Sequence, residues 1–121
     1  MNHAECKYDI EGLASELEVT LSDLAPLFSS YFDEMSEAAG EMELFLLDGE
    51  WNKLQRVVHN IKGVSVNLGI KDVYSAAGVL DALLKEGEYQ EAGIHVKIVL
   101  SILADARENI EKYFEERGFA I

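Results

Sequence analysis

The sequence contains little proline, cysteine or positive charge, and each shortage narrows the class of protein. One proline, Pro26, in 121 residues disfavours a sandwich or barrel of many short strands, which needs more turn formers. One cysteine, Cys6, cannot form a disulfide within the chain. Ten lysines and arginines against 23 aspartates and glutamates give a net charge of -13. This charge opposes binding to nucleic acid or to an anionic membrane surface.

Long apolar runs are also missing. No stretch approaches the roughly 18 apolar residues of a membrane-spanning helix, and the first residues lack the apolar core of a signal peptide. We therefore expect a cytoplasmic protein that does not contact a membrane. A hydrophobic fraction of 49% nevertheless excludes a disordered chain, and the length suits one domain, residues 1–121, with a core of its own.

Apolar residues recur at steps of three and four almost throughout, which predicts an all-α protein. Four long helices with short connections pack most simply as an antiparallel up-down four-helix bundle, here with a short additional N-terminal helix. The bundle core is expected over about residues 22–117 and the short helix over about residues 9–18. The long helices are predicted over about residues 22–48, 50–69, 71–86 and 90–117.

Single residues in these helices also have predicted places. Ser22 is a suitable N-cap for the second helix, and Gly69 can end the third in a left-handed conformation. Leu17 and Leu27 lie on the apolar stripes of the first and second helices, so both are predicted to be buried.

Enzyme signatures are mostly missing. The sequence has no glycine-rich phosphate loop, no cysteine pair, no histidine pair at metal-ligand spacing and no Gly-x-Ser-x-Gly. We therefore expect no metal site, no bound cofactor and no complete catalytic site on this chain. One stretch does stand out, Val-Val-His-Asn-Ile-Lys-Gly-Val-Ser-Val-Asn-Leu-Gly at residues 57–69.

A helical wheel separates the histidine of this stretch from the core. With Leu54 at zero, the apolar residues fall between about -80° and +40°, whereas His59 lies near about 140° and is predicted to be exposed. Gly63, four residues later, costs about 1 kcal/mol in helix propensity but clears space beside the imidazole. Lys62, three residues later, can reach a group carried on His59 and offset its negative charge.

An imidazole is a competent phosphoryl acceptor at neutral pH. Its unperturbed pKa of about 6.5 leaves a ring nitrogen unprotonated in a substantial fraction of molecules. No separate base is needed to activate it. The other two histidines are weaker candidates, because His3 lies near the N-terminus and His95 is not followed by a Lys-Gly pair.

The motif His-x-x-Lys-Gly at residues 59–63, followed by Leu-Gly at 68–69, resembles the signature of histidine-containing phosphotransfer (HPt) domains of two-component phosphorelays. The similarity extends upstream through Leu-Asp-Gly-Glu-Trp at 47–51 and downstream to Asp81, so that it covers roughly residues 22–115. Small departures occur at positions 58 and 64, where this chain has valine and the family often has smaller residues. Neither position lies on the histidine face.

The resemblance implies a four-helix bundle whose histidine, here His59, accepts a phosphoryl group from a receiver-domain aspartate or a kinase and passes it to another receiver. It implies that Lys62 stabilises the phosphoryl charge and that Gly63 gives steric access. The chain would then be a covalent phosphocarrier rather than an enzyme. Its expected partners are a response-regulator receiver domain, a histidine kinase or both, with magnesium on the receiver, and the chain itself is expected to be a monomer.

Two alternative functions stay open. One is a helical adaptor that binds a signalling partner through the same face without phosphorylation, which the presence of Lys62 and Gly63 around His59 argues against. The other is the phosphoacceptor domain of a chemotaxis-type histidine kinase, although the Met1 start favours a stand-alone protein and no kinase domain is present in these residues. The sequence does not identify the cognate receivers or the direction of phosphate flow.

Positive charge gathers around the histidine. Residues 51–71 contain four cations and no acidic residue, a local charge of +4, so the other 100 residues carry -17. A partner that brings an acidic pocket to His59 would meet a compatible surface there. The predicted docking residues around His59 are Asn52, Gln55, Arg56 and Val66.

Overall fold

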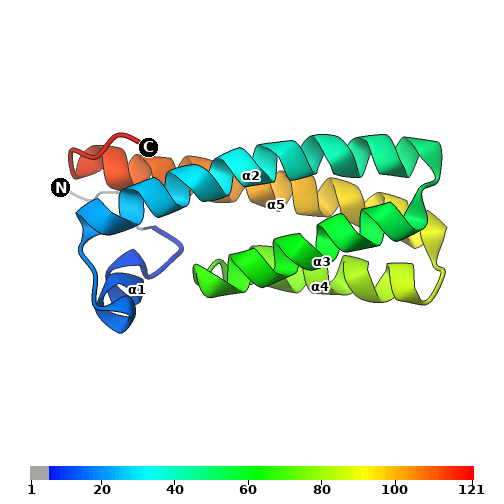
Figure 1. Cartoon of the computed structure of the whole chain (residues 1–121), viewed down its shortest axis with the longest axis horizontal. Coiled ribbons are helices and arrows are strands. Elements are labelled where there is room, and N and C mark those ends of the chain that lie inside the picture. The colour runs from blue at the N-terminus through cyan, green and yellow to red at the C-terminus, as the bar shows by residue number, and fades with distance from the viewer. Residues whose placement is uncertain (1–5) are drawn as a thin grey trace.

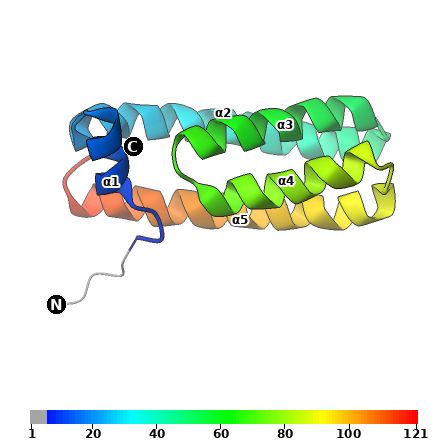
Figure 2. The same cartoon turned by 90° about the horizontal axis from the view of Figure 1, so that it is seen from below.

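The computed structural model describes residues 6–121, which form helices joined by short turns (Figure 1). Helices α2 to α5 alternate in direction, so that each lies antiparallel to the one before it, and α1 crosses one end of them (Figure 2). The predicted all-α class and up-down bundle are confirmed. The helices are α1 (Ile10–Leu17), α2 (Leu21–Asp48), α3 (Trp51–Asn67), α4 (Lys71–Lys85) and α5 (Tyr89–Glu116).

The four long helices differ in length, and α1 occupies the place that the difference leaves. Helices α2 and α5 have 28 residues each, whereas α3 and α4 have 17 and 15. The segment before α1 is held to both α4 and α5, because the Tyr8 hydroxyl donates to Asp72 at 3.0 Å and the Lys7 amide donates to Asn109 at 2.9 Å. Among residues 6–121, no helix is long and apolar enough to cross a membrane.

The apolar stripes of the helices meet in one core, in which Phe28 of α2 and Phe114 of α5 lie with ring centroids 5.7 Å apart. The predictions for Leu17 and Leu27 are wrong, since they are 46% and 48% exposed. Leu17 is the last residue of the short α1 and extends past its packed turns. Leu27 lies one turn before Tyr31, whose hydroxyl contacts Ser65 close to the end of α3, so it lies at the level where the shorter α3 ends.

The start of α2 is fixed by a reciprocal cap. The Asp23 amide donates to the Thr20 hydroxyl at 3.1 Å, and the Thr20 amide donates to the Asp23 carboxylate at 3.0 Å. The N-cap is therefore Thr20, and the prediction of Ser22 is wrong because Ser22 already lies within the first turn. The prediction for Gly69 is confirmed, as it follows α3 with φ of 72°.

A buried polar contact joins α2 to α3. The hydroxyls of Tyr31 and Ser65 lie 2.7 Å apart, and Ser65 is fully buried. Burial raises the pKa of Tyr31 to about 12, because the charged phenolate is unfavourable away from water. The pair fixes the rotation of α3 against α2, and with it the direction in which the opposite face of α3 points.

Candidate functional site

His59 lies in the middle of α3 on the face that points away from the core. Its side chain is 72% exposed, whereas Leu54, Val58 and Ile61 on the other face are fully buried. The apolar stripe therefore determines where the imidazole points, as the helical wheel indicates.

A buried carboxylate lies directly behind the imidazole. Asp81 of α4 is only 2% exposed, and its Oδ2 atom is surrounded by three basic side chains. Lys85 Nζ lies 3.1 Å from this oxygen, His59 Nδ1 3.8 Å and Lys62 Nζ 4.0 Å. Because Nδ1 faces the carboxylate, Nε2 is on the opposite side of the ring.

Lys62 lies between the carboxylate and an aromatic ring. Its side chain is 31% exposed, and its ammonium is 5.8 Å from the centroid of Tyr74 on α4. Gly78 of α4 lies beside it, and a Cβ at Gly78 would make only an ordinary van der Waals contact with Lys62 Cε, at 3.9 Å. The ammonium thus lies close to His59 while still reaching solvent.

Gly63 leaves the surface beside His59 open. The residue is exposed, and a Cβ placed on it would have no heavy atom within 4 Å beyond its own helical surroundings. Packing in the described chain does not require a glycine here. The glycine therefore leaves open space at the surface one turn after His59.

The predicted docking residues all lie on α3, but they are not equivalent. Asn52, Arg56 and Val66 are exposed, with Val66 at 46%. Gln55 is half-buried instead, and its amide nitrogen donates to Asp81 Oδ1 at 3.5 Å. Gln55 therefore belongs to the group of side chains behind His59 as well as to the edge of the exposed face.

Asp81 and Lys85 are the members of the site that sequence reasoning missed as functional residues. The sequence does hold a signal for Asp81, because it interrupts the apolar positions 73, 77, 80 and 84 of α4 with a charge. A charged residue inside an apolar stripe needs a partner when it is buried. Lys85, four residues later, is at the spacing of such a partner on a helix.

The remaining histidines lie elsewhere. His95 is half-buried on α5, and His3 is outside the described residues. Among residues 6–121, no group of three or more histidine, cysteine or acidic side chains is arranged to hold a metal ion.

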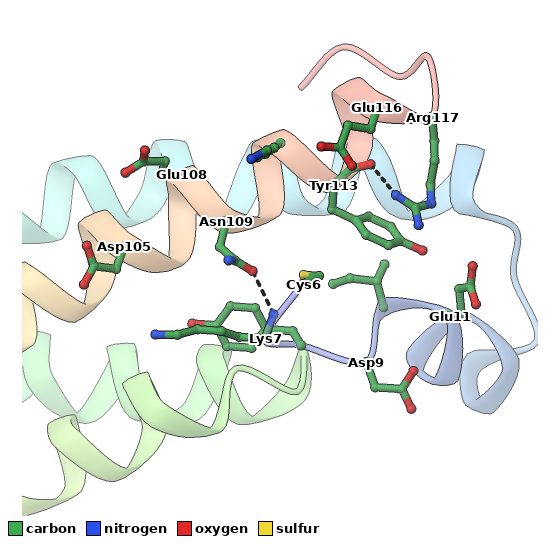
Figure 3. A pocket seen from close by; sticks show the side chains of 13 residues that line it. Cys6, Lys7, Asp9, Glu11, Asp105, Glu108, Asn109, Tyr113, Glu116 and Arg117 are labelled. Carbon is green, nitrogen blue, oxygen red and sulfur yellow. Dashed lines mark hydrogen bonds between the residues drawn. The ribbon is translucent and has the colours of Figure 1, made fainter. Parts of the chain in front are cut away.

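A cavity of about 840 Å³ lies at a different place, between the segment before α1 and the C-terminal half of α5 (Figure 3). Charges of both signs surround it, and Arg117 stacks 3.6 Å above the ring of Tyr113. No residue of α3 lines this cavity, so it is separate from His59. Its charged lining residues are Lys7, Asp9, Glu11, Asp105, Glu108, Lys112, Glu116 and Arg117.

The Hpt domain family matches residues 26–112 of the chain, which include the whole of α3 and α4. The protein therefore belongs to the Hpt domain family, as the resemblance predicted. Hpt domains are phosphocarriers of two-component signalling rather than enzymes, and they interact with receiver domains or kinases. No curated protein and no solved structure matches the chain.

Proposed function

We propose that this Hpt domain carries a phosphoryl group on His59, which it accepts from the aspartate of one receiver domain and passes to another. The observation that carries the proposal is the combination of an exposed imidazole, an ammonium beside it and an open glycine next to it on α3. The buried carboxylate of Asp81 behind the ring adds a means of orienting the imidazole.

The geometry favours Nε2 as the atom that is phosphorylated. With the proton on Nδ1, toward Asp81, the lone pair of Nε2 points outward and attacks the phosphorus of the aspartyl phosphate. The new P–N bond forms as the P–O bond breaks, and the receiver aspartate leaves as a free carboxylate. The Nδ1 proton stays in place, so the ring becomes positively charged, and Asp81 stabilises that charge as a carboxylate stabilises other imidazolium ions.

Lys62 and Gly63 have separate roles in this reaction. The ammonium of Lys62 offsets the negative charge of the phosphoryl oxygens as they transfer. Gly63 admits the receiver close enough for an in-line displacement, because any larger side chain would project into the path of approach. Magnesium and the acidic pocket are supplied by the receiver.

The test uses a panel of receiver domains phosphorylated with acetyl phosphate. The parent protein should take up an acid-labile phosphoryl group from at least one receiver, and His59→Gln should take up none. His95→Gln is the matched control and should behave as the parent does.

Uptake by His59→Gln at the parental rate would contradict the proposal and make His95 the next candidate. A parent chain that binds receivers without taking up phosphate would indicate a helical adaptor instead.

A further inference from the structure

Asp81 is surrounded by more positive charge than one carboxylate can neutralise. Two lysines and a histidine direct their nitrogens to a single oxygen of a side chain that is 2% exposed. A buried carboxylate requires a close cation, because its loss of hydration is unfavourable. It does not require two, and both Lys62 and Lys85 lie within 4.0 Å of it.

The two lysines are held to different degrees. Lys85 lies 3.1 Å from Asp81 Oδ2, on the same helix and one turn away, which is the distance of a direct ion pair. Lys62 belongs to α3 and lies at 4.0 Å, with Tyr74 on its other side. Lys85 is therefore the firm partner of the carboxylate, and Lys62 is the loose one.

We propose that the Asp81–Lys85 pair controls the availability of Lys62. While Lys85 neutralises Asp81, the ammonium of Lys62 can leave the carboxylate and bind the phosphoryl group when His59 carries one. This inference rests on the proposed function of His59. In it, Asp81 and Lys85 act as positioning residues, and only Lys62 touches the phosphoryl oxygens.

Charge explains why the Lys62 ammonium moves from Asp81 to the phosphoryl group. A phosphoryl group carries up to two negative charges and three acceptor oxygens, so it competes well for a cation that is held at 4.0 Å. Without Lys85, the buried carboxylate would depend on Lys62 for its neutralisation. Lys62 would then be drawn to Asp81 and lost to the phosphoryl group.

The test is a set of substitutions that keep side-chain length. The protein is first phosphorylated with phosphoramidate. The rate of transfer from phosphorylated His59 to an accepting receiver is then measured. Lys85→Met should slow transfer about tenfold, the effect of losing one charge-assisted contact. Lys97→Met, the same charge change at an exposed position of α5, is the control and should leave the rate unchanged.

A coupling measurement separates this role from a merely structural one. Lys85→Met should have almost no effect in an Asp81→Asn background, because no carboxylate remains to capture Lys62. It should also add nothing to Lys62→Met. Thermal unfolding followed by circular dichroism verifies that each variant is folded, which is expected because the Lys85 side chain is 57% exposed.

Three results of these experiments would contradict the inference. Equal rates for Lys85→Met and Lys97→Met, with a parent that transfers normally, would overturn it and leave the proposed function intact. An undiminished effect of Lys85→Met in the Asp81→Asn background would also overturn it, since Lys85 would then act on the phosphoryl group directly. A parent that takes up no phosphate on His59 would refute the proposed function and the inference together.

Discussion

Trp51 and Tyr89, the first residues of α3 and α5, stack with their ring centroids 4.3 Å apart and their planes at 2°. Each follows a turn with a glycine of positive φ, Gly49 and Gly87. The two turns lie at the same end of the bundle (Figure 1), and the stacked rings connect them. This end is thus held by an aromatic pair, whereas α1 covers the other.

We expect Tyr89→Leu to lower the free energy of unfolding by about 1 kcal/mol, the typical contribution of an aromatic pair beyond its buried area. Transfer through His59 should be unchanged, because the pair lies two turns away from it along α3. Urea denaturation and a transfer assay on the same preparation test both statements. A slower transfer with unchanged stability would mean that Tyr89 belongs to the docking surface.

Gly63→Gln should fold at least as well as the parent, since the position is open and glutamine has the higher helix propensity by about 0.5 to 1 kcal/mol. Transfer should fall about tenfold or more, because the new side chain blocks the approach to His59. Thermal unfolding and the transfer rate are measured side by side. Full transfer by this variant would remove the steric explanation for the glycine.

Lys62→Ala should slow transfer while leaving the binding of receivers largely intact. In the proposed mechanism the ammonium acts on the phosphoryl charge, and the Lys62 side chain, 31% exposed, offers little surface to a partner. The rate should fall about tenfold, as for the loss of one charge-assisted hydrogen bond. Titration calorimetry with an unphosphorylated receiver gives the affinity, and a loss of affinity equal to the loss of rate would contradict this role.

Arg56→Glu should slow association with the receiver, mainly through the on-rate, and the difference from the parent should shrink as salt is raised. Arg56 lies one turn before His59 on its exposed side. Lys53→Glu makes the same charge change on the side of α3 next to α2, where its ammonium lies 5.8 Å from the ring of Phe45. Stopped-flow mixing at two salt concentrations compares them, and equal effects would show that only net charge matters.

The buried Tyr31 should make the protein sensitive to alkali. Its pKa is about 12 in the folded chain against about 10 when unfolded, so above pH 10 the unfolded chain releases a proton that the folded chain keeps. Stability should therefore fall as the pH rises from 10 to 12, by up to about 1.4 kcal/mol per pH unit from this group. Urea unfolding at several pH values measures the slope.

Tyr31→Phe is the matching variant. It should remove the contribution of one proton from the slope of the free energy of unfolding between pH 10 and 12. At neutral pH it should lower the free energy of unfolding by about 1 to 3 kcal/mol, because the Ser65 hydroxyl stays buried without its partner. Adding Ser65→Ala should recover part of that loss. An unchanged alkaline slope in Tyr31→Phe would assign the effect to the other tyrosines.

The sequence was sufficient to predict the features that depend on the residue pattern of a single helix. The wheel predicted the exposure of His59 and the open place of Gly63, because the apolar stripe of α3 is regular. It erred at Leu27, where burial depends on how far the neighbouring helix extends. Asp81 was missed for a related reason, since the contact between α4 and the back of His59 depends on how α3 and α4 pack, which no periodicity within either helix specifies.

Every group of the His59 cluster comes from the hairpin of α3 and α4, including Gln55, Lys62, Asp81 and Lys85. Among residues 6–121, the other helices contact this hairpin elsewhere, as Tyr31 does at Ser65, and supply no side chain to the group around Asp81. The outer faces of α2 and α5 can therefore accumulate substitutions without altering the side chains around His59. If α3 and α4 were transplanted onto two supporting helices from another protein, the cluster around His59 should be preserved. The rest of the molecular surface would then be that of the other protein.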